Sequence, residues 1–123
     1  MTTTALILFA HGARHPEWAE TLNRLCRAVR ARLSDARVEP AYLEFMAPSL
    51  EDCAAGLVAE GFSRIVVIPM FLAQGGHLKE DLPKILAGLR AAHPQVSFEL
   101  TGPIGEAEAV VQAMAAHVVM LAG

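Results

Sequence analysis

The sequence contains little charge, few aromatic residues and almost no cysteine. Charged residues make up 19% of the 123 residues, aromatic residues make up 6%, and there are two cysteines. Cys26 and Cys53 form no Cys-x-x-Cys motif, so we expect neither a disulfide framework nor a structural zinc site and interpret both as small core residues. The net charge of −3 comes without a cluster of basic residues, which argues against a nucleic-acid partner.

The sequence also lacks an apolar run long enough to cross a membrane, although 54% of its residues are hydrophobic. The longest run, residues 109–122, is interrupted by Gln112 and His117 and is shorter than the roughly 20 apolar residues of a membrane span. The N-terminus has no basic segment before its short apolar run, so we expect no secretory signal. We therefore expect a cytoplasmic protein with no membrane partner. The length predicts one domain, residues 1–123.

Strand-like apolar runs alternate with apolar residues at helical spacing along the chain. Runs of consecutive apolar residues predict strands, whereas apolar residues three to four positions apart predict amphipathic helices. Four strands, each followed by a helix, predict an α/β fold: a flavodoxin-like open four-stranded parallel sheet in the order 2-1-3-4, flanked by helices. The predicted strands cover residues 5–10, 38–45, 64–72 and 96–100, and the predicted helices begin near Pro16, Pro48, Asp81 and Glu106.

Two prolines and the apolar content of the strands indicate where individual strands lie. Pro40 predicts that the second strand lies at the edge of the sheet, because proline has no N–H for a second neighbour. The third strand is the most apolar and contains a β-branched run, which favours a central position. Pro69 predicts that its pairing loosens near its end.

The last predicted helix, residues 106–121, is apolar on nearly all sides. A helix on the surface of a monomer normally has a polar face toward water. Two interpretations remain open, a tightly packed core helix and a helix that forms part of a homodimer interface. We favour the second.

Two histidines follow the first and third predicted strands. In an open parallel sheet, ligands bind beyond the carboxyl ends of the strands where the strand order reverses, which is between the first and third strands here. His11-Gly12 follows the first strand, and Gly75-Gly76-His77 follows the third, so the topology predicts both imidazoles at one crevice. Neutral imidazole binds iron, cobalt, nickel, copper or zinc, and two ligands leave coordination positions open, so we expect an exchangeable metal ion.

Glu44 lies near the end of the second predicted strand, at the same edge of the sheet. Its carboxylate is either an oxygen ligand or proton acceptor for this site, or an ordinary solvated side chain. Other reaction classes lack their motifs: the sequence contains no Gly-x-Ser-x-Gly elbow, no P-loop and no Gly-x-Gly-x-x-Gly.

Three stretches of the sequence resemble a known family. Residues 8–16 (LFAHGARHP), 43–50 (LEFMAPSL) and 67–83 (VIPMFLAQGGHLKEDLP) are similar to the small, single-domain CbiX-type sirohydrochlorin chelatases, class II relatives of ferrochelatase. The resemblance implies an enzyme that inserts Co²⁺, Fe²⁺ or Ni²⁺, as substrate and without an organic cofactor, into sirohydrochlorin for cobalamin, siroheme or a nickel tetrapyrrole. It assigns the metal to His11 and His77 and implies a homodimer. Ala13 departs from the serine usual in the family.

The implied tetrapyrrole partner is a polycarboxylate, whereas this chain is net acidic. Arg14 and Lys79 are the cations nearest to the two loops in the sequence, and together with Gly75 and Gly76 they are candidates for binding the ring. Each cation is about as well explained as a plain surface charge. The leading hypothesis is a metallochelatase. The alternatives are a non-catalytic metal- or tetrapyrrole-binding or delivery protein that uses the same two histidines, and a flavodoxin-like module without a metal role.

Overall fold

The structure is a computed structural model that describes residues 3–123. Met1 and Thr2, which belong to the predicted domain and to the segment where no signal is expected, lie outside the described residues. In the described residues, strands alternate with helices in the order that the sequence predicts. In chain order the elements are β1 (Thr4–Ala10), the 3-10 helix η1 (Pro16–Ala19), α1 (Glu20–Arg32), β2 (Arg37–Tyr42), α2 (Leu50–Ala59), β3 (Arg64–Pro69), α3 (Gly76–Ala92), β4 (Ser97–Leu100), the 3-10 helix η2 (Ile104–Glu106) and α4 (Glu108–Leu121).

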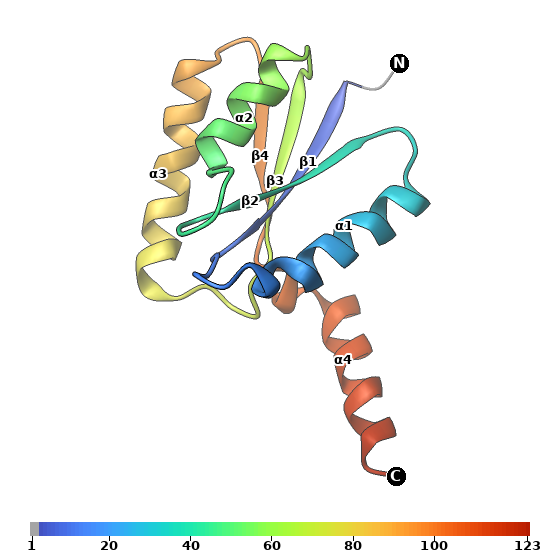
Figure 1. Ribbon diagram of the computed structural model, residues 1–123. Helices are drawn as coiled ribbons and strands as arrows, with labels where there is room; N and C mark the ends of the chain where they lie inside the picture. The colour runs from blue at the N-terminus through green and yellow to red at the C-terminus, as the bar shows by residue number, and fades with distance from the viewer. Residues whose placement is uncertain (1–2) are drawn as a thin grey trace.

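The strands of residues 3–123 form one four-stranded sheet in the order β2-β1-β3-β4, and all pairs are parallel. Both the predicted order and the predicted direction of the strands are confirmed (Figure 1). Pro40 lies in the edge strand β2, and its missing N–H is on the side away from β1, because the Tyr42 N–H two residues later donates to Pro48 and not to β1. The apolar strand β3 lies between β1 and β4, as predicted for the most apolar strand.

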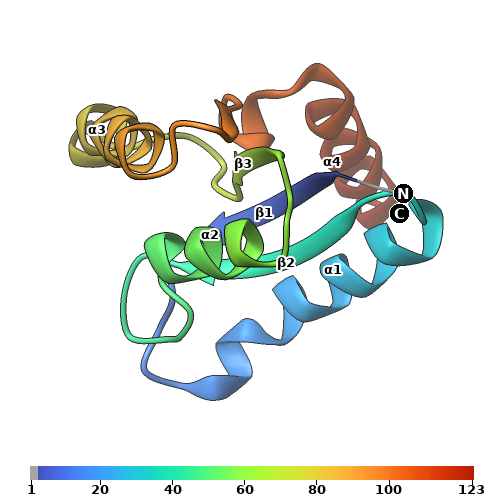
Figure 2. The ribbon, with the colours of Figure 1, turned by 90° about the horizontal axis from the view of Figure 1, so that it is seen from above.

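Helices cover both faces of the sheet. α2 and α3 lie on one face, while α1 lies on the other (Figure 2). Because side chains alternate along a strand, Ile7 and Phe9 of β1 pack with α2 and α3, whereas Leu8 and Ala10 pack with α1. Each face therefore has its own apolar cluster.

Both cysteines lie inside these clusters, as predicted. Cys26 of α1 is 1% exposed and packs with the cluster under α1, and Cys53 of α2 is 8% exposed and packs with the larger cluster. Burial raises the pKa of Cys53 to about 11 and also raises the pKa of Cys26. Both thiols therefore stay protonated at neutral pH and contribute as small apolar groups.

Two strands end earlier than their apolar runs predict. β2 ends at Tyr42 and not at residue 45, and the chain then turns back, so that the Tyr42 N–H donates to the Pro48 carbonyl, 2.9 Å away, on the outer side of the strand. β3 ends at Pro69 and not at residue 72, since proline has no N–H to continue the ladder. The loosened pairing predicted at Pro69 is found toward β4, whose last partner in β3 is Val67, whereas the Met70 N–H still donates to the Phe9 carbonyl of β1 at 2.7 Å.

The third helix begins earlier than predicted. Asp81 was expected to be its N-cap, but α3 begins at Gly76, with Gly75 in an extended conformation as the N-cap. Leu78 packs against the larger core cluster one turn before the fully buried Leu82, and this contact favours the additional helical turn. Pro83 consequently lies inside the helix and not in its first turn, which removes one helical hydrogen bond.

The last helix does not pack on the sheet. α4 begins at Glu108, after the short helix η2, and extends past the carboxyl edge of the sheet (Figure 1). None of its residues, all of them described, is buried. The packed core helix considered from the sequence is therefore excluded for the single chain. No helix among residues 3–123 combines the length and apolar character that a bilayer span requires.

The larger cluster predicts a clear difference between two leucine substitutions. Leu86 is completely buried, so Leu86→Ala leaves a cavity and should lower the free energy of unfolding by about 2–5 kcal/mol. Leu33→Ala, at a side chain that is 39% exposed, should change it by only about 0.5 kcal/mol. Urea unfolding followed by circular dichroism measures both values. Equal losses for the two variants would contradict this description of the core.

Candidate functional site

The loop after β1 is hydrogen-bonded to the segment after β2. The Leu43 N–H donates to the Ala10 carbonyl at 2.9 Å, and the Glu44 N–H donates to the His11 carbonyl at 3.0 Å. These bonds continue the β1–β2 pairing for two residues beyond the end of the sheet. His11 and Glu44, which were predicted separately from two strand ends, therefore lie on directly bonded neighbouring segments.

Gly12 allows this close approach. Its φ angle is +87°, in the left-handed region that favours glycine, and an added Cβ would overlap with the Glu44 carbonyl oxygen. A larger residue at position 12 would therefore push the His11 loop away from Glu44. The glycine after His11 keeps the two segments in contact.

An exposed aromatic ring lies next to Glu44. Phe45 has a φ angle of +67° and is 55% exposed. The Arg14 guanidinium lies over its ring, 4.4 Å from the centroid, in a cation–π arrangement. Arg14 is thereby held at the same edge of the sheet as His11 and Glu44, with its hydrogen-bond donors accessible to an acidic ligand.

The ring of Phe71 contacts the imidazole of His11. The two ring centroids are 4.4 Å apart with an angle of 36° between the planes, and Phe71 is 6% exposed. The Phe71 carbonyl accepts a hydrogen bond from the Gly105 N–H at 2.9 Å, which ties this residue to the segment after β4. The buried Phe71 ring thus gives the exposed His11 imidazole a fixed apolar surface to rest on.

The N-terminus of α3 carries the second group of predicted residues. Gly75 is its N-cap, and Gly76, His77 and Lys79 lie in its first turn, not in a loop as the sequence predicted. The first backbone N–H groups of a helix have no helical partner, and the helix dipole places partial positive charge there. This helix end and the Lys79 ammonium together favour a negatively charged ligand.

Seven residues were predicted for the site, and the structure brings some of them together. His11, Arg14 and Glu44 share one connected pair of loops, while the α3 residues form a second group. All seven are exposed to solvent: His11, Arg14, Glu44, Gly75, Gly76, His77 and Lys79.

Among residues 3–123, no hydrogen bond, ion pair or ring contact links His77 to His11 or Glu44. In the same described range, no three His, Cys, Asp or Glu side chains are close enough to hold a metal ion together. The single chain therefore presents separate candidate ligands and no closed metal site.

Sequence reasoning missed Phe45 and Phe71. Both residues fell within predicted strands, where an aromatic side chain is normally explained by the core. The structure instead places Phe45 under Arg14 and Phe71 under His11.

The fold and these loops define a parallel α/β domain with polar ligand-binding candidates at the carboxyl edge, at the switch point between β1 and β3. The family model described as CbiX matches residues 5–120. The chain therefore belongs to the CbiX family, as the sequence motifs predicted.

The chain is similar to proteins named as sirohydrochlorin chelatases. The chain is 35% identical over 89 residues to the sirohydrochlorin cobaltochelatase of Methanocaldococcus jannaschii, a match that covers 72% of this chain and 62% of the relative. It is 31% identical over 100 residues to the chloroplastic sirohydrochlorin ferrochelatase of Arabidopsis thaliana, covering 81% of this chain and 44% of the relative. The matched part thus spans less than two thirds of either relative.

Solved structures agree with the fold. The CbiX protein from Marinobacter aquaeolei VT8 superimposes with a TM-score of 0.83 at 32% identity, and the match covers 95% of both chains. The cobalt complex of the sirohydrochlorin chelatase SirB from Bacillus subtilis superimposes with a TM-score of 0.79 at 26% identity. That match covers 96% of this chain but 50% of SirB.

The contact at Gly12 predicts that Gly12→Ala destabilises the protein. The new Cβ meets the Glu44 carbonyl at a positive φ, so unfolding should become easier by about 1–3 kcal/mol. Gly88→Ala is the matched control, because Gly88 is exposed on α3 and nothing lies within 4 Å of an added Cβ. This control should be neutral or stabilise by up to about 1 kcal/mol. A Gly12→Ala variant as stable as the control would contradict the close approach.

Proposed function

We propose that the protein is a metallochelatase that inserts a divalent metal ion, Co²⁺, Ni²⁺ or Fe²⁺, into sirohydrochlorin. The observation that carries the proposal is the family match over residues 5–120, within which His11 and Glu44 lie on bonded segments at the carboxyl edge. Relatives named as cobalto- and ferrochelatases support the reaction class. We also propose that the protein acts in the cytoplasm, as expected from the sequence.

The reaction sets three requirements for the site. The metal ion has to lose water, reach one face of the ring and replace two pyrrole protons, so that one M²⁺ enters for each two H⁺ released. In the proposal, His11 and His77 bind the ion through neutral imidazoles and leave its other coordination positions open for the ring nitrogens. A site with few protein ligands releases its ion more readily than a closed site with four.

Proton transfer needs an acceptor near the ring. In the proposal, the exposed Glu44 carboxylate or an imidazole accepts the pyrrole protons. The hydrogen bond from the Glu44 N–H to the His11 carbonyl supports this role, since it holds the backbone of Glu44 beside that of one proposed metal ligand. The contact of the His11 ring with the buried Phe71 ring supports capture and release of the ion at one place.

The substrate carboxylates require positive partners on an acidic protein. In the proposal, Arg14, held over Phe45, and Lys79 bind carboxylates at the rim of the ring. The backbone N–H groups at Gly75 and Gly76 bind a further carboxylate at the start of α3. These local groups offset the net charge of −3 where the ring binds.

The role of the two histidines is testable by substitution. The double variant His11→Ala/His77→Ala should lose about 100-fold or more of the metal-insertion rate, because both proposed ligands are removed. His93→Ala is the control, since His93 lies at the far end of α3 against Phe98 and should retain the parent rate. Absorption changes of sirohydrochlorin with Co²⁺, Ni²⁺ or Fe²⁺ give the rates and the metal preference. Insertion by the parent protein at the protein-free rate would favour a binding or delivery protein.

The proposal also predicts a pH dependence. Activity should fall as the pH drops below about 6, because a protonated imidazole has no lone pair for the metal. Rates measured between pH 5 and 8 check this, with circular dichroism at each pH to confirm that the protein stays folded. A rate that stays constant down to pH 5 would exclude imidazole as the working ligand.

We also propose that the protein is a homodimer, as the sequence predicted. SirB is about twice as long as the part of it that this chain matches. This length supports a second copy of the chain in the place of the other half of SirB.

A further inference from the structure

The imidazole of His11 lies against Phe71. Among residues 3–123, this imidazole makes no hydrogen bond and no ion pair, and its ring contact is with Phe71, with the ring centroids 4.4 Å apart. Phe71 is buried, whereas His11 is exposed. The place of the exposed imidazole therefore depends on the place of the buried ring.

Phe71 lies past the end of β3, so strand pairing does not hold its backbone. β3 ends at Pro69, and β4 pairs with it only as far as Val67. The Phe71 ring packs edge-on against Phe9, with the centroids 6.0 Å apart. Its carbonyl accepts a hydrogen bond from the Gly105 N–H of η2 at 2.9 Å. η2 thus holds the backbone of Phe71 at a point beyond the end of the strand.

Gly105 lies so close to this segment that a side chain has no room. An added Cβ would overlap with the Cα and the carbonyl oxygen of Leu72 and would lie 2.7 Å from its carbonyl carbon. These are backbone atoms, so a change of rotamer does not relieve the overlap. The φ angle of Gly105 lies outside the left-handed region, in contrast to that of Gly12. The close approach to Leu72, and not the backbone conformation, therefore requires glycine at position 105.

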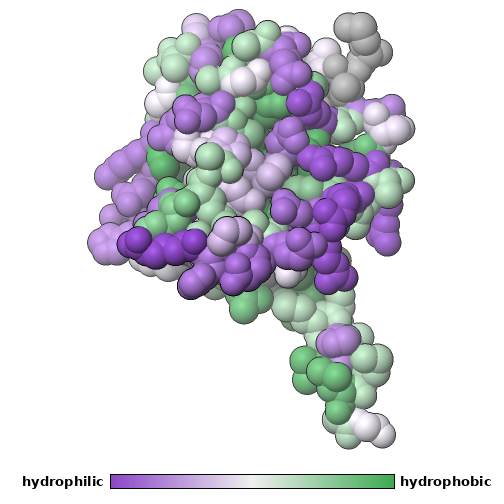
Figure 3. Space-filling view, viewed as in Figure 1, coloured by the Kyte–Doolittle hydropathy of each residue, from purple (hydrophilic) through white to green (hydrophobic). Residues whose placement is uncertain are grey.

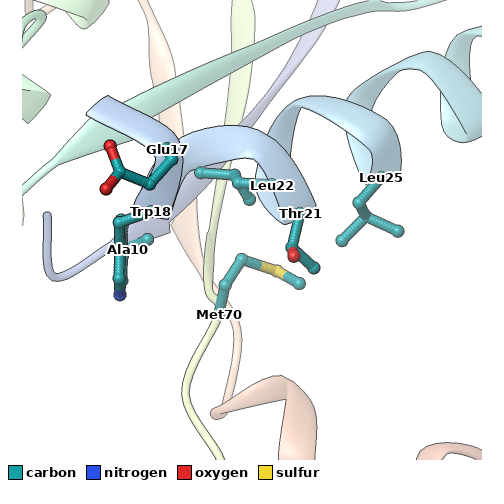
Figure 4. Close-up of a pocket in the computed structure, with 7 residues that line it drawn as sticks. All are labelled: Ala10, Glu17, Trp18, Thr21, Leu22, Leu25 and Met70. Atoms are coloured by element: carbon teal, nitrogen blue, oxygen red, sulfur yellow. The ribbon is translucent and has the colours of Figure 1, made fainter. Parts of the chain in front are cut away.

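The segment beside Gly105 has room to move. Met70, directly before Phe71, borders a hollow of about 500 Å³ between the start of α1 and the end of β3. Figure 4 shows the Met70 side chain in this hollow, beside Thr21. Leu72, directly after Phe71, is 72% exposed. A side chain at position 105 is therefore expected to displace Phe71 and not to unfold the domain.

The helix α4, which follows η2, does not connect position 105 to His11. Figure 3 shows α4 as a largely hydrophobic projection from the body of the domain. Among residues 3–123, no hydrogen bond, ion pair or ring contact links α4 to His11 or to Phe71. Within the chain, an effect of position 105 on His11 therefore passes through Phe71.

We propose that Gly105 is a positioning residue for His11. Its N–H and its lack of a side chain hold Phe71 where the phenyl ring determines the place of the imidazole. This inference deepens the proposed function and rests on it, since a ligand that captures an ion and passes it to a ring has to stand at a defined place. Gly105 itself touches neither the metal ion nor the ring in this proposal.

NMR signals of the imidazole protons test the positioning without metal. The phenyl ring shifts the signals of protons next to it, and the His11 signals are identified by their loss in His11→Ala. Gly105→Ala should move the His11 signals toward those of Phe71→Leu, which has no ring at this position. Gly102→Ala is the matched control, because Gly102 lies between β4 and η2 and nothing lies within 4 Å of an added Cβ. This control should leave the His11 signals unchanged.

Two results would overturn the positioning. The first is a folded Gly105→Ala variant whose His11 signals equal those of the parent. The second is an equal shift of the His93 signals, since His93 lies at the far end of α3 and would then report a general rearrangement.

The metal-insertion rate separates this inference from the proposed function. Gly105→Ala should lower the rate by about tenfold or more, because the imidazole is misplaced, while Gly102→Ala should retain the parent rate. Shifted His11 signals with the parent rate would contradict the metal role of His11 and leave the positioning intact. Parent-like signals and rate in Gly105→Ala, together with a lost rate in His11→Ala, would contradict the positioning alone.

Two further measurements apply if circular dichroism shows that Gly105→Ala does not fold. In the parent protein, nuclear Overhauser effects should connect the ring protons of His11 and Phe71, and their absence would overturn the proposal. Phe71→Leu keeps a buried apolar side chain but removes the ring, so it should lower the insertion rate by about tenfold. Phe71→Tyr keeps the ring and should restore the rate. Equal rates in these two variants would overturn the proposal as well.

Discussion

The pairing of β1 with β2 on one side and with β3 on the other is the constraint on which the site depends. The register places Ala10 opposite Tyr42 and Phe9 opposite Pro69, so three strands end at the same level. Hydrogen bonds continue this pairing past the strand ends, including one from the Met70 N–H to the Phe9 carbonyl at 2.7 Å. The loops that follow therefore start side by side, although they are distant in the sequence. A shift of one residue in either register would separate them and reverse every side chain of β1.

Local charge at this edge differs from the charge of the whole chain. Arg30, Arg37 and Arg64 are paired with glutamates on the body of the domain, so these cations are already engaged. Arg14 lies over an aromatic ring and forms no ion pair with any of residues 3–123, which leaves its positive charge available at the edge. The start of α3 adds partial positive charge without an additional basic residue. An acidic protein can thus present a surface for an acidic ligand, because binding depends on the field at the site and not on the total charge.

The sequence was sufficient for the order of the strands, the burial of both cysteines and the family, because alternating periodicities and the switch-point rule depend on local pattern. It did not locate the element ends. Asp81 has the chemistry of an N-cap, yet the buried Leu82 and the core contact of Leu78 extend α3 back to Gly76. The roles of Phe45 and Phe71 also could not be predicted, because a ring under a cation or an imidazole depends on how two distant loops meet.

α4 shows that an apolar sequence pattern does not by itself place a helix on the core of its own domain. An isolated helix of 14 residues is only marginally stable in water, so most of its stability has to come from packing of its apolar face. The helices α1, α2 and α3 each pack their apolar face against the sheet of the same domain. α4 does not, since the chain turns at η2 and α4 extends past the carboxyl edge of the sheet. The exposed apolar side chains of α4 therefore lie beyond the same edge of the sheet as the His11 loop.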